Sequence, residues 1–347
     1  MSDDPNHLVT TRRDDRALLI TMERAAKRNA IDRSMADQLD AALNELDDDP
    51  ALWAGVLTGT AEVFSAGSDL TAGGDYVTER GGEYGIIRRP RRKPLIAAVE
   101  GPALGGGLEI VLACDLVVAS TAASFGLPEV RIGVVPTCAG LFRGPRALPL
   151  NLARQLILTG RPVDARRGHE VGFVNVLTEP GAAVAEARRL AEEICTNAPV
   201  SVQACLAAVN TLASVDDDIG WEQTAGALGA AAASADAREG VRSFLEKRPP
   251  VWSGRRARRP DSGRLVEGAT EDAVRLGVAV DDPVEPPRHP PSRSGAAKLP
   301  LVRRHAPDLV ALEGVQVHLR VRDRRGHVPV HRDDGCRLHV RTALPDE

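Results

Sequence analysis

The stretch KPLIAAVEGPALGGGLEIVLACDLVVAS, Lys93–Ser120, decides the fold of this chain. Its first part, Pro94–Val99, is a short apolar run of the length and composition of a strand. Three consecutive glycines follow, and Leu108–Cys114 then continues as an apolar helix before a second strand-like run, Leu116–Ala119. Strands that alternate with helices in this way indicate crossover units and predict an α/β fold.

The flanking sequence repeats the alternation. Ala17–Met22 and Trp53–Thr58 read as further strands, and the residues between them recur at helical spacing behind an N-cap at Asp32, namely Met35, Leu39, Leu43 and Leu46. Val184–Ile194 shows an apolar helical stripe, and the sequence from 199 to about 248 is almost entirely helical. Aromatic residues make up only 3% of the chain, so aliphatic and alanine packing must fill the core.

Residues 254–347 differ in composition from everything before them. They contain no Phe, Tyr or Trp, ten prolines and six of the eight histidines of the chain. We therefore expect a domain over 1–253 and an Arg/Pro/His-rich tail that is mostly disordered, with one plausible strand at Val315–Val321. An appended interaction module and a shifted reading frame are the alternatives for this tail.

Charge and cysteine usage exclude several classes of protein. The N-terminus, MSDDPNHLVTTRRDDR, is charged where a secretory signal needs an apolar run, so we expect a cytoplasmic protein without membrane contact. A net charge of −4 gives no general attraction for nucleic acid. The five cysteines form neither a CxxC pair nor a zinc-ligand spacing, so no metal is expected.

The three glycines, Gly105 to Gly107, stand where a loop enters a helix. Unpaired backbone N–H groups and the positive end of the helix dipole point outward at such a junction, and glycine lets a ligand carbonyl come close. This is the geometry of an oxyanion hole, although three glycines alone also fit a tight turn with close packing. Neither the GxGxxG pattern of dinucleotide sites nor the GK[ST] pattern of phosphate loops occurs here.

Two glutamates accompany the glycines. Glu109 follows Gly106 by three residues, so on a helix its carboxylate lies on the same face as the Gly106 N–H. Glu129 follows a proline in the apolar loop FGLPEVRIG, a setting that raises the pKa of a carboxyl and suits it to proton exchange near neutrality. Either glutamate alone also fits a surface or salt-bridged residue.

Four segments together resemble the crotonase (enoyl-CoA hydratase/isomerase) superfamily in order and spacing. They are FSAGSDL (Phe64–Leu70), Lys93–Ser120, FGLPEVRIGVVP (Phe125–Pro136) and LTGRPVDA (Leu158–Ala165). The resemblance covers about Arg16 to Arg255, and the closing FLEKRPPVWSGR is similar to the ending of crotonobetainyl-CoA hydratase-like members. The tail lies outside it.

The resemblance implies a role for each matching residue. The backbone N–H groups of Ser68 and Gly106 would bind the thioester oxygen, and Glu109 and Glu129 would position a water and move protons. Coenzyme A enters as part of the substrate, with no separate cofactor. It would be bound by residues of two loops: Ser68, Asp69, Leu70, Thr71, Lys27 and Arg28.

The resemblance also implies a fold, an assembly and a reaction. The fold is a spiral of β-β-α turns, and C-terminal helices over about Ala185–Arg248 would build a homotrimer or a dimer of trimers. Because members that only isomerise usually have one acid/base carboxylate, the two glutamates favour hydration of 2-enoyl-CoA thioesters. The alternatives are an enoyl-CoA isomerase, a carnitinyl-CoA dehydratase-like enzyme, and a non-catalytic acyl-CoA-binding or RNA-binding homologue.

One loop departs from the family pattern. Members of the family are rich in glycine after the proline of the third segment, whereas this chain reads TCAGLFRGPR over Thr137–Arg146, with Thr137 and Ala139 in place of glycines. That loop helps to hold the water in the family. The departure leaves substrate choice, and turnover itself, open.

Overall fold

The computed structural model describes residues 7–72 and 76–253. The predicted strand Val315–Val321 and the remainder of the predicted tail lie outside these residues.

A six-stranded sheet forms the centre of the described fold, in the order β1-β2-β3-β6-β8-β11. Only β1 runs antiparallel to its neighbour, and the other strands pair in parallel. β3 and β6 are buried along their whole length, as expected of parallel strands with both faces covered. The bounds are β1 (Val9–Asp14), β2 (Ala17–Met22), β3 (Ala54–Thr58), β6 (Leu95–Val99), β8 (Leu116–Ser120) and β11 (Val176–Thr178).

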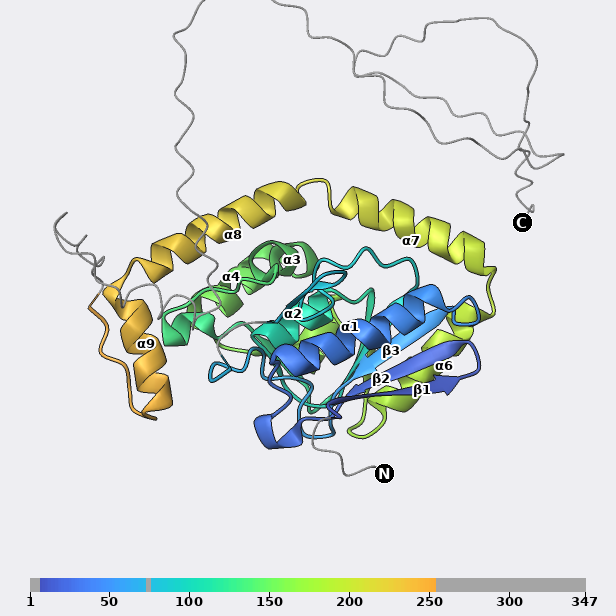
Figure 1. The fold of residues 1–347 in the computed structure, drawn as a ribbon, viewed down its shortest axis with the longest axis horizontal. Coiled ribbons are helices and arrows are strands. Elements are labelled where there is room, and N and C mark those ends of the chain that lie inside the picture. The colour runs from blue at the N-terminus through green and yellow to red at the C-terminus, as the bar shows by residue number, and fades with distance from the viewer. Residues whose placement is uncertain (1–6, 73–75, 254–347) are drawn as a thin grey trace, which may run out of the picture. The chain divides into compact units, whose positions relative to one another are not determined.

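Helices cover the two faces of this sheet (Figure 1). α1 (Arg33–Asp48) begins at Asp32, whose carboxylate accepts a hydrogen bond from the Met35 N–H at 2.9 Å, and it packs on β1 and β2. α6 (Ala183–Cys195) packs on the opposite face against β3, β6 and β8. The α6 contact is made through small side chains, as the low aromatic content requires: Ala183, Ala187 and Ala191.

The chain steps repeatedly from the large sheet to a small one. β6 leads into β7 (Ala103–Leu104) and then α2 (Gly106–Leu112), and β8 leads into β9 (Ser124–Gly126) and the 3-10 helix η2 (Glu129–Ile132). β7 and β9 pair in parallel, and β10 (Val163–Asp164) completes this second sheet. The order strand, strand, helix is the β-β-α turn that the family resemblance predicts.

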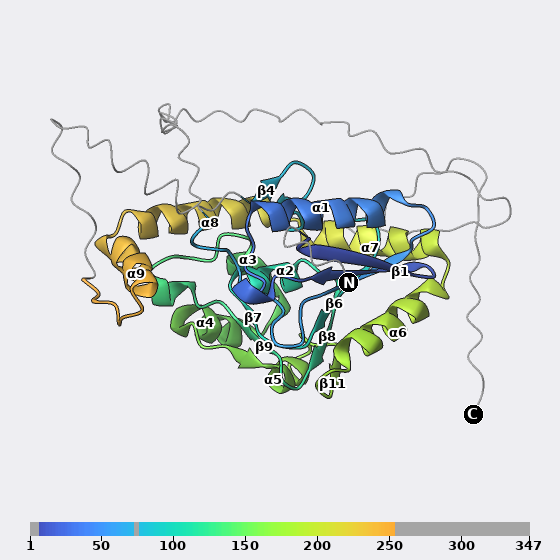
Figure 2. The ribbon, with the colours of Figure 1, turned by 60° about the horizontal axis from the view of Figure 1, so that its bottom comes forward.

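Helices make up most of the rest of the described chain. α7 and α8 follow one another in an arc that leads to α9, with α8 lying beside α3 (Figures 1 and 2). The Phe142 and Trp221 rings, 5.1 Å apart between centroids, join α3 to α8. The bounds are α3 (Gly140–Ala147), α4 (Leu150–Thr159), α5 (Ala165–Glu170), α7 (Pro199–Ala213), α8 (Asp217–Ala232) and α9 (Ala235–Leu245), with a hairpin of β4 (Val77–Thr78) and β5 (Gly82–Glu83) between β3 and β6.

Candidate active site

A cavity of about 620 Å³ collects every site residue predicted from the sequence. These residues come from loops and helices far apart in the chain: Lys27, Arg28, Ser68, Asp69, Leu70, Thr71, Gly106, Glu109 and Glu129. Packing of η1 (Ala25–Lys27), the loop after β3, α2 and η2 therefore creates one site.

Two backbone N–H groups are available to a ligand in this cavity. Gly106 is the first residue of α2, where an N–H has no acceptor within the helix. The backbone on both sides of Ser68 is hydrogen-bonded to Ile31: the Gly67 carbonyl accepts from the Ile31 N–H at 2.7 Å, and the Asp69 N–H donates to the Ile31 carbonyl at 2.8 Å. The Ser68 N–H therefore points away from Ile31. Neither N–H has an acceptor among the described residues. The pair can bind a carbonyl oxygen that gains negative charge.

Glycine is required at Gly67 and Gly106 by close contacts, and at Gly105 by the backbone conformation. Gly105 has φ +57°, a left-handed conformation that L side chains rarely adopt. A Cβ on Gly106 would lie 2.4 Å from the Tyr84 hydroxyl oxygen, and a Cβ on Gly67 would lie 2.8 Å from the Gly106 nitrogen. The loop after β3 and the start of α2 thus approach one another backbone to backbone.

Glu109 lies one turn into α2 and is buried. Its Oε1 atom accepts hydrogen bonds from the N–H groups of Cys138 and Gly140, at 2.7 and 2.9 Å. Burial raises the pKa of Glu109 to about 7, and these two N–H groups oppose the rise. The residue between them, Ala139, has φ +76°, the left-handed conformation for which glycine is better suited.

Glu129 is the first residue of η2, and its carboxyl lacks the backbone N–H partners that Glu109 has. Its Oε1 atom is 3.2 Å from the place of a Cβ on Gly105, which puts the carboxyl beside the start of α2. Its Oε2 atom is buried and has no hydrogen-bond partner among the described residues. Burial, and then the charge of Glu109, raise the pKa of Glu129 to about 8. Glu109 is therefore the better carboxylate of the two and Glu129 the better proton donor.

The residues predicted to bind coenzyme A differ in their surroundings. Asp69 has a structural role, whereas Lys27 and Arg28 are exposed cations. The Asp69 carboxylate accepts from the Thr71 N–H and hydroxyl, at 3.0 and 2.6 Å, and pairs with Arg24 at 2.9 Å, so it shapes its loop. Lys27 and Arg28 are exposed on the cavity rim, and neither forms an ion pair within 7–72 or 76–253. They are placed to meet negative charge on a ligand.

Sequence reasoning missed part of the wall. Tyr76 and Tyr84 line the cavity, and their rings stack with centroids 4.7 Å apart. Apolar side chains of α8 and α9 also line it, among them Leu228 and Phe244. No motif identifies these residues, because their contacts depend on how the hairpin and the C-terminal helices fold back.

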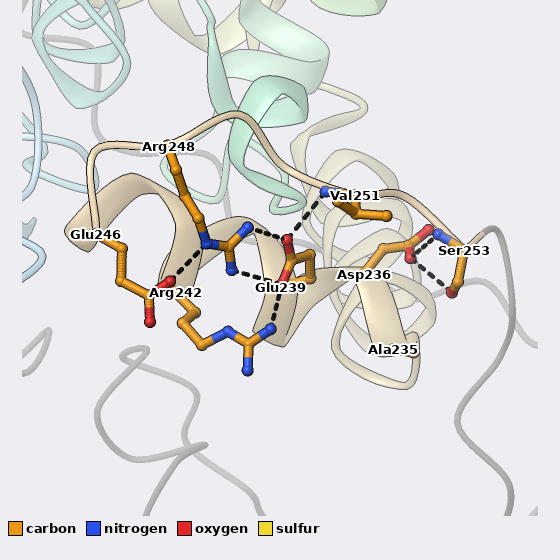
Figure 3. A pocket seen from close by; sticks show the side chains of 8 residues that line it. All are labelled: Ala235, Asp236, Glu239, Arg242, Glu246, Arg248, Val251 and Ser253. Atoms are coloured by element: carbon orange, nitrogen blue, oxygen red, sulfur yellow. Dashed lines mark hydrogen bonds and ion pairs between the residues drawn. The ribbon is translucent and has the colours of Figure 1, made fainter.

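A second, open pocket of about 580 Å³ lies against α9 (Figure 3). Glu239 there accepts hydrogen bonds from Arg242, Arg248 and the Val251 N–H, at 2.6 to 3.0 Å. These contacts fasten the segment that follows α9 back onto the helix. Arg248 lines both pockets, so this clasp also fixes one edge of the larger cavity.

The described residues contain neither a candidate membrane span nor a candidate metal site. None of their helices combines the length and the apolar character that a membrane span needs. Within the same ranges, no three His, Cys, Asp or Glu side chains gather in a way that could bind a metal ion.

The chain is similar in sequence and structure to known proteins. The profile of the family described as enoyl-CoA hydratase/isomerase matches residues 13–255. The chain is 40% identical to a putative enoyl-CoA hydratase of Thermus thermophilus, over 65% of this chain and 92% of that protein. It is 36% identical to a carnitinyl-CoA dehydratase of Citrobacter koseri, over 69% of this chain and 95% of that protein. A crystal structure of carnitinyl-CoA hydratase from Mycobacterium avium superposes with a TM-score of 0.68 at 38% identity, covering 72% of this chain and 99% of that one.

Proposed function

The chain belongs to the enoyl-CoA hydratase/isomerase family, within the crotonase superfamily, and on that premise we propose that it is an enoyl-CoA hydratase. This hydro-lyase adds water reversibly across the 2,3 double bond of a 2-enoyl-CoA thioester. The observation that carries the proposal is one cavity with two unpaired N–H groups and two glutamates in opposite environments.

The first step is polarisation of the thioester. Hydrogen bonds from Ser68 and Gly106 to the carbonyl oxygen draw electrons from the conjugated double bond, which makes the β-carbon electrophilic. They stabilise the enolate-like transition state more than the ground state, and one such donor contributes about 2.7–4 kcal/mol.

The two glutamates then move the protons. Glu109 takes a proton from water as the water oxygen bonds to the β-carbon, and the electron pair of the double bond shifts onto the carbonyl oxygen. Glu129 gives its proton to the α-carbon as the carbonyl re-forms. The product is a 3-hydroxyacyl-CoA, and transfer of the proton from Glu109 to Glu129 resets the site.

The substrate supplies its own anchor in this proposal. The loop Ser68–Thr71 borders the coenzyme A moiety, and Lys27 and Arg28 meet its phosphates at the rim. Hydration changes no overall oxidation state, so the proposed reaction uses no redox cofactor. The described cysteines Cys114, Cys138, Cys195 and Cys205 are free thiols, which supports our placement of the enzyme in the reducing cytoplasm.

The loop after Pro136 supports catalysis despite its unusual sequence. Ala139 has φ +76°, a conformation that favours glycine, and the two flanking N–H groups hold the Glu109 carboxylate. The hydrogen bonds from this loop to Glu109 support a catalytic protein over a non-catalytic homologue.

A specialised substrate is the second candidate. The wall beside the glutamates carries the hydroxyl-bearing side chains of Tyr76 and Thr137, which suit a polar acyl group. Relatives named carnitinyl-CoA dehydratase match over most of this domain, and dehydration is the same reaction in reverse.

A panel of thioesters tests the proposal. The purified protein should remove the absorbance of the conjugated thioester from crotonyl-CoA, from a longer 2-enoyl-CoA or from crotonobetainyl-CoA. An isomerase would instead generate that absorbance from a 3-enoyl-CoA. Tight binding without turnover of any thioester would contradict the enzyme assignment.

We further propose that the enzyme assembles as a homotrimer or a dimer of trimers. In the described chain α7 has no buried residue, and apolar side chains on it stand in solvent, with Val200 78% and Leu212 75% exposed. Such a helix needs a partner. Light scattering should give a multiple of the chain mass, and Leu212→Glu should lower it, whereas Leu158→Glu, at a 73% exposed position on α4, should not.

A further inference from the structure

Tyr84 is held in a strained and fully enclosed position. It follows β5 with φ +55°, which is uncommon for a bulky residue, and its side chain is 2% exposed. Its N–H donates to the Tyr76 carbonyl at 2.8 Å, and the two rings stack. Strain of this kind persists only where the surroundings impose it, and it gathers at functional sites.

The Tyr84 hydroxyl lies between the two halves of the oxyanion hole. Its oxygen is 2.7 Å from the Ser68 Oγ atom, a hydrogen bond that ties the loop after β3 to the hairpin. It also lies 2.4 Å from where a Cβ on Gly106 would stand, so it rests against the first residue of α2. Burial raises the pKa of Tyr84 well above its ordinary value, so the hydroxyl stays neutral.

The flanks of Ser68 show why this bond matters. Gly67 has φ +89°, and the Asp69 side chain is fastened to Arg24 and Thr71. The Ser68 hydroxyl is hydrogen-bonded to the Tyr84 hydroxyl at 2.7 Å and also interacts with the side chain of Tyr76. The bridge to Ile31 sets the direction of the Ser68 N–H, and the bond to the Tyr84 hydroxyl adds a side-chain anchor that joins Ser68 to the start of α2.

We propose that Tyr84 is a positioning residue of the oxyanion hole: its hydroxyl holds Ser68 so that the Ser68 and Gly106 N–H groups converge on one thioester oxygen. The inference rests on the proposed hydratase function and goes beyond it by adding a residue outside the motifs. Because Tyr84 acts through Ser68, removing either hydroxyl should have the same effect.

The test is a double-mutant cycle of Tyr84→Phe and Ser68→Ala. Each should lower kcat about tenfold, the kinetic equivalent of one neutral hydrogen bond, with KM changed less than about twofold. The double variant should be no slower than the slower single variant, because both remove the same bond. Additive losses, or a Tyr84→Phe enzyme with wild-type kcat, would overturn the proposal.

A spectroscopic measurement separates positioning from stability. An arylacryloyl-CoA absorbs at longer wavelength when its carbonyl is polarised, so its red shift on binding should shrink in both single variants. Ser120→Ala removes a buried serine hydroxyl that donates to the Glu100 carbonyl at 2.6 Å outside the cavity, and it should keep the full shift. An undiminished shift in the Tyr84 and Ser68 variants would leave them a structural role only.

These readouts keep the two hypotheses apart. If the wild-type protein hydrates no thioester, the proposed function fails. The role of Tyr84 is still tested by the red shift, provided that the protein binds the arylacryloyl-CoA. If Tyr84→Phe does not fold, Ser68→Ala decides alone, because it removes the same bond and leaves the aromatic stack in place.

Discussion

Glu109 and Glu129 are the same chemical group held in two environments that favour different protonation states. Two backbone N–H groups stabilise the Glu109 carboxylate, whereas the buried Oε2 atom of Glu129 has no partner in the described residues. In the proposed mechanism a proton acceptor and a proton donor thus result from burial, charge and hydrogen bonding, with no difference in side chain.

Replacing either glutamate by glutamine should stop proton transfer without emptying the site. Glutamine keeps the size and most hydrogen bonds of glutamate but does not exchange a proton near neutrality, so kcat should fall about 10²–10⁴-fold with KM little changed. Steady-state kinetics on a 2-enoyl-CoA checks this. Near wild-type hydration by Glu129→Gln would contradict the two-glutamate mechanism.

Glu100→Gln is the matched control for these variants. Glu100 is also buried and also accepts two backbone N–H groups, from Gly181 and Ala183 at 2.8 and 2.7 Å, but it is not part of the cavity wall. It should lower the free energy of unfolding and leave kcat within about twofold, because its acceptors serve the fold and not the reaction.

The buried Glu129 should also make stability depend on pH. Its pKa rises from an ordinary 4.5 to about 8 on folding, so between these values the folded chain keeps a proton that the unfolded chain has lost. This contribution is complete below about pH 4.5 and disappears as the pH rises through 8. Between pH 5 and pH 8, wild type should lose about 1–3 kcal/mol of unfolding free energy relative to Glu129→Gln. Urea denaturation at both pH values measures the difference, and parallel losses would contradict it.

At the scale of elements, the sequence predicts those parts whose signal is local. Ala17–Met22 is β2 to the residue, and the Asp32 N-cap of α1 is confirmed, because apolar periodicity and capping depend on neighbours in the chain. β1 was missed: it is polar and mostly exposed, with only Val9 buried, so its place as an edge strand comes from pairing with β2. Tyr84 could not be found either, since its hydroxyl meets Ser68 only after the hairpin folds over the loop.

At the scale of elements, α9 packs against η2, and this contact helps to position Glu129 at the start of η2. A Cβ on Gly240 of α9 would lie 2.1 Å from the Ile132 carbonyl oxygen, and backbone atoms cannot rotate away. Gly240→Ala should therefore push α9 from η2, lowering the free energy of unfolding by about 1–3 kcal/mol and also kcat.

Gly226 of α8 is the control: a Cβ there meets nothing within 4 Å, so Gly226→Ala should stabilise by about 0.5–1 kcal/mol and leave kcat unchanged. Equal behaviour of the two variants in thermal unfolding and kinetics would contradict this account.

At the scale of the whole molecule, the cavity is completed late in the chain. Its wall begins at Lys27 and ends at Pro250, so the loop that we propose to bind the substrate's phosphates and the segment after α9 line one space. The clasp on Glu239 fixes this last segment through Arg248 and Val251 (Figure 3). Residues up to Pro250 therefore contribute to the cavity wall.

The same observation predicts where the chain can be cut. A protein that ends at Arg255 keeps every residue of the cavity wall, the clasp, and the whole of the family match, which ends at 255. We expect its kcat, its melting temperature and the number of subunits in its assembly to equal those of the full chain. A protein that ends at Leu245 is the control: it loses Arg248 and Pro250, and it should unfold at a lower temperature and bind thioesters more weakly, because Glu239 loses two of its three partners. Aggregation of the 1–255 protein, or a smaller number of subunits in light scattering, would show that residues 256–347 belong to the folded assembly.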